Sequence, residues 1–170
     1  GSHTLPLSDL VGSSGQVVAF EPTHFAYQKL KENIKLNPLL ASRISTQQMM
    51  LCASIDDNLE TNLYSSWPLD TNKDLHEKHK GRLMTTTGAS VCTLDQAVED
   101  MGLNKVDFIK LDVDGHEYSV ISGGMDTIRR YNPVILMELA PYLFKENFEC
   151  FDKLIKLFRE SNYCFFDADT

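Results

Sequence analysis

The most reactive side chains of this sequence are concentrated between residues 112 and 117, in the segment Asp-Val-Asp-Gly-His-Glu. Asp112, Asp114 and Glu117 carry carboxylates, and His116 carries an imidazole, the side-chain type that most readily exchanges protons near neutral pH. One interpretation of this group is a general base. Another is a binding site for Mg²⁺, Mn²⁺ or Ca²⁺, because these hard cations prefer oxygen donors.

The same segment also fits an ordinary acidic helix start. Asp114 would then cap the helix, Glu117 would complement its positive end, and His116 would lie in solvent. We favour this structural role for Glu117. For Asp112, which still belongs to the preceding apolar run, we favour a functional role, and His116 fits both interpretations equally.

Polar side chains also follow three other apolar runs of the chain. Glu21, Ser54 and Glu138 stand at or near the ends of these runs. Ligands of open parallel sheets bind outside the carboxyl ends of the strands. We therefore group these three residues with Asp112 and Asp114 as candidate site residues.

Glu21 is the cofactor-binding candidate of this group. A carboxylate that ends a strand suits a ribose, because its two oxygens can accept hydrogen bonds from two vicinal hydroxyls. An isolated Glu-Pro pair also fits a simple strand end. The membership of Glu21 in a set of polar strand ends favours the cofactor interpretation.

The elements that must position these residues follow from hydrophobic periodicity. Apolar runs predict strands, and apolar residues three or four positions apart predict amphipathic helices. The predicted strands are 16–20, 48–53, 106–113, 133–139 and 163–166. The predicted helices follow Thr23 as far as Asn37-Pro38, run from Thr93 to Gly102, pass through Val120, Ile121, Met125 and Ile128, and cover 147–162.

Two further features refine this prediction. Thr93 opens a Thr-x-x-Gln capping box, and Gly102 stands where a helix C′ glycine belongs. Residues 59–90 show no clear period, and we expect an irregular excursion there. This stretch contains His76 and His79, whose charged surroundings favour a solvated face over metal binding.

The alternation of strands and helices predicts the fold class. Near-continuous apolar strands separated by helices are typical of an α/β protein with a mostly parallel sheet and helices on both faces. A length of 170 residues fits one such domain.

Charge and composition exclude several classes of function. The 24 acidic residues outnumber the 16 basic residues, for a net charge of −8, which disfavours nucleic acid as a partner. No apolar run approaches the roughly 18 residues of a membrane span. The 4 cysteines form no CxxC pair, so we expect free thiols, a reducing compartment and a cytoplasmic location, with no metal bound by cysteine.

Four segments together resemble the FkbM-like methyltransferases, and they occur in the order that this family shows. They are Val-Val-Ala-Phe-Glu-Pro at 17–22, Thr-Leu-Asp at 93–95, Asp-Phe-Ile-Lys-Leu-Asp-Val-Asp-Gly-His-Glu at 107–117 and Pro-Val-Ile-Leu-Met-Glu-Leu at 133–139. The resemblance implies an S-adenosylmethionine-dependent enzyme with a Rossmann-like class I sheet of seven strands. Its known members mostly methylate hydroxyl groups, often on sugars, glycolipids or polyketides.

The resemblance also bears on the two ends of the chain. The family carries a first strand that ends in a glycine-rich loop, and Gly1-Ser2-His3-Thr4-Leu5 resembles the tail of that loop, although Gly-Ser-His is also a common tag remnant. By this comparison the first and last strands are missing. We therefore expect residues 1–170 to form one truncated domain of a longer protein, which would bind the cofactor weakly on its own.

The resemblance assigns roles to individual residues. Gly1 and Glu21 would contact the cofactor, Glu21 through the ribose hydroxyls, while Ala53 and Ser54 would border the adenine. Asp112 would lie beside the methionine end. Asp114, His116 and Glu138 would surround a small-molecule or glycan acceptor and orient or deprotonate its hydroxyl.

Two alternatives remain beside this interpretation. Asp112 with Asp114 also resembles the metal-holding acidic pair of other O-methyltransferases and the Asp-x-Asp pair of glycosyltransferases, so a divalent-metal nucleotide-sugar transferase is one alternative. A non-catalytic binding module with the same fold is the other. The sequence leaves the need for a divalent metal open and indicates neither the acceptor nor the oligomeric state.

Overall fold

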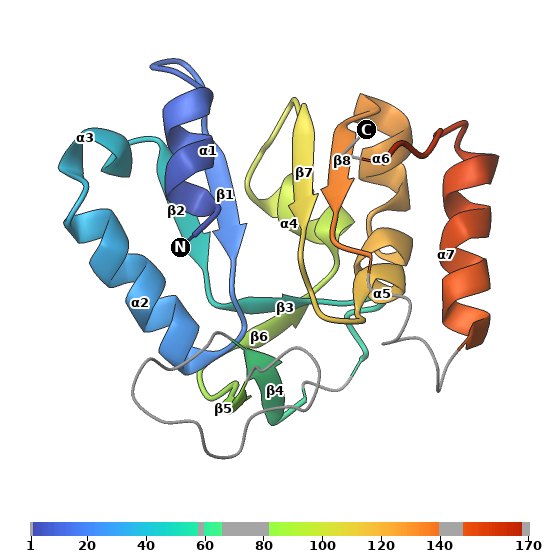
Figure 1. Cartoon of the computed structure of the whole chain (residues 1–170), viewed down its shortest axis with the longest axis horizontal. Coiled ribbons are helices and arrows are strands. Elements are labelled where there is room, and N and C mark those ends of the chain that lie inside the picture. The colour runs from blue at the N-terminus through green and yellow to red at the C-terminus, as the bar shows by residue number, and fades with distance from the viewer. Residues whose placement is uncertain (1, 58–59, 66–81, 140–147, 168–170) are drawn as a thin grey trace. The chain divides into compact units, whose positions relative to one another are not determined.

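The computed structural model describes residues 2–57, 60–65, 82–139 and 148–167 (Figure 1). The chain divides into two compact units, Gly1–Met50 with Asn58–Val91 and Leu51–Asp57 with Cys92–Thr170. Each unit thus combines segments that are far apart in the sequence. The described residues form a mixed α/β structure whose strands pair as four two-stranded sheets.

The first unit contains a parallel strand pair covered by helices. Strand β1 runs parallel to β2, with Val17 opposite Ile44 and Phe20 opposite Gln47 (Figure 1). A second pair, β4 with β5, is antiparallel. The elements of this unit are α1 (Thr4–Leu10), β1 (Val17–Phe20), α2 (His24–Lys35), α3 (Pro38–Ala41), β2 (Ile44–Gln47), β4 (Asn62–Ser65) and β5 (Arg82–Thr85).

The strand predicted at 48–53 is confirmed, although it is shorter than predicted, and the strand just before it was missed. The structure has two strands in this region, β2 and then β3 (Met49–Leu51), and it is β2 that pairs with β1, whereas β3 pairs with β6 (Ser90–Cys92). Strand β2 has the sequence Ile-Ser-Thr-Gln, which contains no apolar run. Its β-branched residues and the hydrogen bonds that β1 offers are sufficient for a strand.

Helix α2 confirms the predicted amphipathic pattern. Its buried residues are Ala26 and Leu30, four positions apart on one helical face. The helix ends before Asn37-Pro38, as predicted. Pro38 then begins the short helix α3, which was not predicted, and proline suits the first turn of a helix because its nitrogen has no hydrogen to leave unpaired there.

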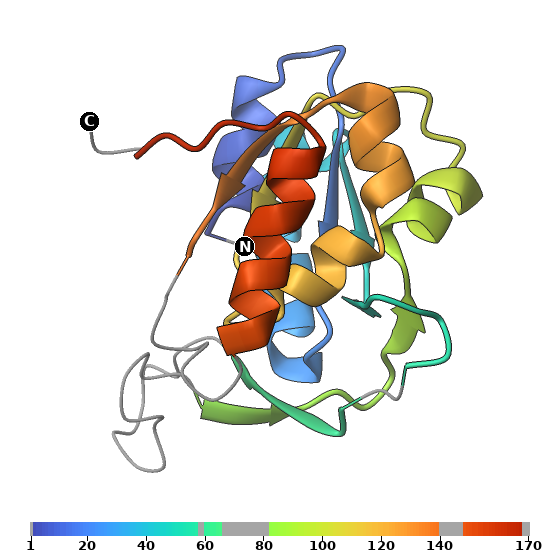
Figure 2. The ribbon, with the colours of Figure 1, turned by 90° about the vertical axis from the view of Figure 1, so that its right-hand side faces the viewer.

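The second unit is built around the parallel pair β7 and β8, in which Phe108 lies opposite Val134 and Leu111 opposite Met137. Helix α7 packs against α5 beside this pair (Figure 2). The elements are α4 (Leu94–Asp100), β7 (Phe108–Leu111), α5 (Glu117–Ser122), α6 (Met125–Tyr131), β8 (Val134–Met137) and α7 (Phe148–Glu160).

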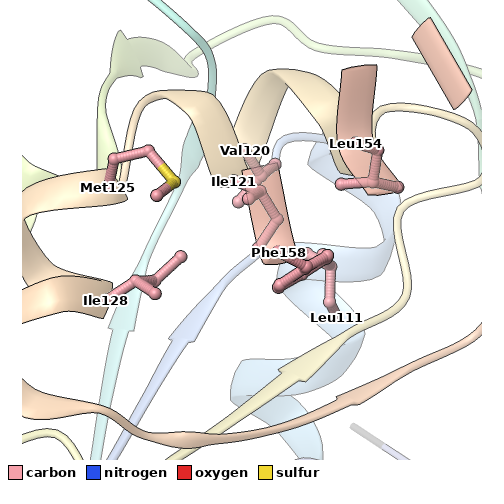
Figure 3. Packing of buried hydrophobic residues seen from close by; sticks show 7 residues of the cluster. All are labelled: Leu111, Val120, Ile121, Met125, Ile128, Leu154 and Phe158. Atoms are coloured by element: carbon pink, nitrogen blue, oxygen red, sulfur yellow. The ribbon is translucent and has the colours of Figure 1, made fainter. Parts of the chain in front are cut away.

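The core of the second unit lies between β7 and the helices α5, α6 and α7 (Figure 3). Ile121 and Leu154 are fully buried there, and side chains of this size gain about 1.5 to 3 kcal/mol each on burial. The core residues are Leu111, Val120, Ile121, Met125, Ile128, Leu154 and Phe158.

The single helix predicted through Val120–Ile128 was wrong, because two glycines divide it into α5 and α6. A Cβ atom at Gly123 would overlap the carbonyl oxygen of Cys52, and one at Gly124 would overlap Leu94. Glycine also weakens a helix by about 1 kcal/mol relative to alanine. Neighbouring segments therefore lie so close that glycine is required at these two positions, and the same glycines interrupt the helix.

The strand predicted at 163–166 was also wrong, because these residues are not part of any strand. The Tyr163 hydroxyl donates a hydrogen bond to the Pro133 carbonyl at 2.8 Å, and the rings of Tyr163 and Phe165 pack against Phe158, each with centroids 5.6 Å apart. An apolar segment can thus be held by ring packing. No strand among the described residues pairs with it.

The remaining expectations divide into those that the structure describes and those that it does not. The excursion at 59–90 contains the β4–β5 pair, whereas Trp67, His76 and His79 lie outside the described residues. Among the helices that are described, none combines the length and apolar character needed to cross a membrane. A single domain over residues 1–170 stays a prediction.

Candidate functional site

Glu21 directly follows β1, and its backbone is fixed by the continuing strand pair, because its N–H donates to the Gln47 carbonyl at 3.1 Å. The side chain is fixed as well. Its Oε1 atom accepts two hydrogen bonds from Thr23, one from the backbone N–H at 2.9 Å and one from the hydroxyl at 2.6 Å. Thr23 thus fixes the orientation of the Glu21 carboxylate at the end of β1.

Thr23 is the residue that the sequence prediction missed here. It is the N-cap of α2, but its hydroxyl makes no cap hydrogen bond and donates a hydrogen bond to Glu21 instead. Thr23 is only 1% exposed. Burial raises the pKa of the Glu21 carboxyl, and the two hydrogen bonds from Thr23 lower it again in part.

Ala53 and Ser54 follow β3 and belong to the second unit. The Ala53 N–H donates to the Ser119 hydroxyl at 3.0 Å, which ties this segment to α5. Ser54 heads a tight turn, because its N–H donates to the Asp57 carboxylate at 3.0 Å and its hydroxyl accepts from the Asp56 N–H at 3.2 Å. Ala53 is exposed and Ser54 is half-buried.

Asp112 and Glu138 lie together at the carboxyl edge of the β7–β8 pair. Each directly follows the last paired residues, Leu111 and Met137, and the Glu138 N–H donates to the Leu111 carbonyl at 3.0 Å. The Asp112 carboxylate also forms an ion pair with Lys110, at 3.6 Å. Both residues therefore stand at the carboxyl ends of adjacent strands, as expected from the sequence, and their roles stay a prediction.

Asp114 and His116 are carried by a tight turn between β7 and α5. The His116 N–H donates to the Val113 carbonyl at 3.1 Å, and the two central residues, Asp114 and Gly115, have φ values of 48° and 103°. Two positive φ values define a type I′ turn, for which Asp-Gly is well suited. Asp114 is exposed and His116 is half-buried.

Glu117 differs from an ordinary acidic residue at a helix start. It lies in the first turn of α5, as predicted, but it is only 1% exposed, and its Oε1 accepts a hydrogen bond from the Gly115 N–H at 3.1 Å. Burial raises the pKa of its carboxyl. The sequence spacing indicates this burial, because Glu117 precedes the core residues Val120 and Ile121 by three and four positions and so lies on the same helical face.

Three other predictions concern metals, thiols and Gly1. The described residues contain no group of three or more His, Cys, Asp or Glu side chains arranged to hold a metal ion. All four cysteines keep their thiols, as predicted, and Cys52 and Cys92 are buried. Gly1 lies outside the described residues.

Comparison with protein-family profiles identifies the family of this chain. The profile of the methyltransferase FkbM domain matches residues 1–165. This chain belongs to the FkbM methyltransferase family. Searches of curated proteins and of solved structures gave no match.

The four segments of the FkbM resemblance have clear places in the structure. Segment 17–22 forms β1 and carries Glu21, and segment 93–95 begins α4, where the Gln96 N–H donates to the Thr93 hydroxyl at 3.1 Å. Segment 107–117 forms β7 and the turn before α5, and segment 133–139 forms β8. Segments 17–22, 107–117 and 133–139 therefore each contain a candidate site residue, and segment 93–95 begins a helix.

Proposed function

We propose that this FkbM family protein is an S-adenosylmethionine-dependent O-methyltransferase that acts on a hydroxyl group of a sugar, glycolipid or polyketide-like acceptor. The observation that carries the proposal is the fixed carboxylate at the end of β1. Glu21 follows the strand directly, and two hydrogen bonds from Thr23 to its Oε1 hold the carboxylate in place.

The residues present fit the cofactor. S-Adenosylmethionine supplies a methyl group on a positively charged sulfur, which an acceptor oxygen can attack. The Glu21 carboxylate has lone pairs on both oxygens, which suits the vicinal hydroxyls of a ribose. Hydrogen bonds from such hydroxyls favour the charged carboxylate and so oppose the effect of burial on its pKa.

Other residues have roles that follow the family resemblance. Ala53 and Ser54 border the adenine, and Asp112 lies beside the methionine end, where its carboxylate suits the ammonium group of that moiety. The parallel pairs β1–β2 and β7–β8 support the Rossmann-like sheet with helices on both faces that the resemblance implies.

The acceptor hydroxyl is handled by Asp114, His116 and Glu138. These residues accept its proton or orient its oxygen, and the exposure of Asp114 and Glu138 leaves both accessible to a solute. Correct alignment of the hydroxyl supplies much of the rate of such a transfer. A positioned base adds a factor of about 10² to 10⁴, because a neutral hydroxyl is a weak nucleophile.

Calorimetric titration of S-adenosylhomocysteine into the natural protein tests the proposal. We expect micromolar binding that is lost in Glu21→Ala and kept in Glu32→Ala, a control that removes an exposed carboxylate from α2 in the same unit. Absence of binding by a folded protein would refute the methyltransferase assignment. Binding of a nucleoside diphosphate that requires Mn²⁺ would then favour the sugar-transferase alternative.

A further inference from the structure

The proposed function leaves one buried acid without a role. Glu117 is 1% exposed, and its Oε1 accepts a hydrogen bond from the Gly115 N–H at 3.1 Å. Its Oε2 is also buried and has no hydrogen-bond partner among the described residues. A buried carboxyl group is costly unless its contacts compensate, so its presence here calls for a reason.

The turn that Glu117 contacts is conformationally demanding. Asp114 has a φ of 48°, a region that residues other than glycine rarely adopt, and Gly115 follows with a φ of 103°. Within the turn, the His116 N–H donates to the Val113 carbonyl. The Gly115 N–H has its partner outside the turn, in the side chain of Glu117.

Glu117 is itself anchored in the core of the second unit. It begins α5, and Val120 and Ile121, three and four positions later on the same helical face, are 3% and 0% exposed. The Glu117 carboxyl therefore connects the turn to closely packed residues. Burial raises its pKa, which favours the neutral acid, and a neutral acid can still accept the Gly115 N–H.

We propose that Glu117 is a positioning residue, which fixes the turn at residues 113–116 and thereby places Asp114 and His116. The role of those two side chains toward an acceptor rests on the proposed function. The effect of Glu117 on the turn does not depend on it.

Amide hydrogen exchange of the natural protein, followed by NMR, tests this inference through two variants. Glu117→Gln keeps a neutral side chain with an oxygen for the Gly115 N–H, whereas Glu117→Leu keeps the bulk and loses the acceptor. We expect exchange of the Gly115 amide within about threefold of the unchanged protein in the Gln variant and about tenfold faster or more in the Leu variant.

The amide of Ile128 separates a local effect from general destabilisation. It donates to the Gly124 carbonyl inside the core at 2.9 Å, so it exchanges by wider opening of the unit. A positioning role predicts that Glu117→Leu accelerates Gly115 far more than Ile128. Equal acceleration of both amides, or no acceleration of Gly115, would overturn the inference.

A second substitution keeps the test possible if Glu117→Leu does not fold. If Glu117→Leu is unfolded, Glu117→Asp replaces it, because its carboxyl is one methylene shorter and withdraws from Gly115. Unchanged Gly115 exchange in the Asp variant would overturn the inference. The titration with S-adenosylhomocysteine is measured separately, so failure of cofactor binding with slow Gly115 exchange refutes the proposed function and leaves the positioning role standing.

Discussion

At the scale of single residues, carboxylates at strand ends were predictable and the groups that orient them were not. Glu21, Asp112 and Glu138 follow apolar runs, so the geometry of parallel strands is enough to place them at carboxyl edges. Thr23 and Glu117 make their contacts through hydrogen bonds between a backbone N–H and a carboxylate two positions away. Such contacts depend on φ and ψ values that residue type alone does not determine.

Thr23 provides a prediction at this scale. Thr23→Val keeps the shape of the side chain and the backbone N–H but removes the hydroxyl that donates to Glu21 at 2.6 Å. Loss of one hydrogen bond to a carboxylate should weaken S-adenosylhomocysteine binding by about tenfold, and Thr23→Ser should restore it. Calorimetry measures both affinities. Equal affinity of the Val variant and the unchanged protein would mean that Thr23 does not position Glu21.

At the scale of elements, the helices and strands with a clear period were predicted, and those defined by distant contacts were not. Strand β2 forms because β1 offers it hydrogen bonds, and α5 and α6 separate because Gly123 lies against the Cys52 carbonyl. The segment at 163–166 is apolar like a strand, but its rings pack on Phe158. In each case the deciding partner is remote in sequence.

Asp95 illustrates how a remote partner completes an element. Its carboxylate accepts hydrogen bonds from the Asp126 N–H at 3.2 Å and the Thr127 N–H at 2.7 Å, while its own N–H donates to the Gly123 carbonyl at 3.0 Å. The N-terminus of α6, which has no side-chain cap of its own, is thus capped from α4. This capping role is therefore sufficient to explain why the Thr-Leu-Asp segment has an Asp at position 95.

We therefore predict that Asp95→Ala lowers the free energy of unfolding by about 1 to 2 kcal/mol, the usual cost of losing a helix cap. Asp95→Asn keeps an acceptor oxygen and should lose less. Urea denaturation followed by circular dichroism measures the change. Glu99→Ala, an exposed residue of the same helix, should stay within about 0.5 kcal/mol, and a similar loss there would contradict the capping role.

At the scale of the whole molecule, the net negative charge and the burial of carboxyl groups both disfavour the ionised form of a carboxyl group. The chain carries a net charge of −8, and burial raises the pKa of two described carboxyl groups, the half-buried Glu21 in one unit and the buried Glu117 in the other. The net charge was evident from the sequence. The division into two units was not, because residues 51–57 join residues from 92 onward only through tertiary contacts.

The raised pKa values of these two carboxyls predict the pH dependence of stability. Burial raises the pKa of both Glu21 and Glu117 above the ordinary value of 4.5, so each folded unit binds a proton more tightly than its unfolded chain. The stability that the neutral acid contributes is fully present below pH 4.5 and is lost as the pH rises through the folded-state pKa. Glutamine does not titrate, so Glu21→Gln and Glu117→Gln should each lose less stability than the unchanged protein as the pH rises from about 5 to 8.

Glu149 supplies a control of opposite sign. Its ion pair with Lys153, at 2.6 Å, lowers the pKa of its exposed carboxyl, so the stability it contributes is present above pH 4.5 and is lost as the pH falls through the folded-state pKa. Urea denaturation of Glu149→Gln should therefore differ from the unchanged protein mainly at neutral pH, by a small amount because solvent screens the pair. If Glu117→Gln followed the same profile as Glu149→Gln, the buried carboxyl would be charged in the folded protein, and the turn before α5 would be held by an anion rather than by a neutral acid.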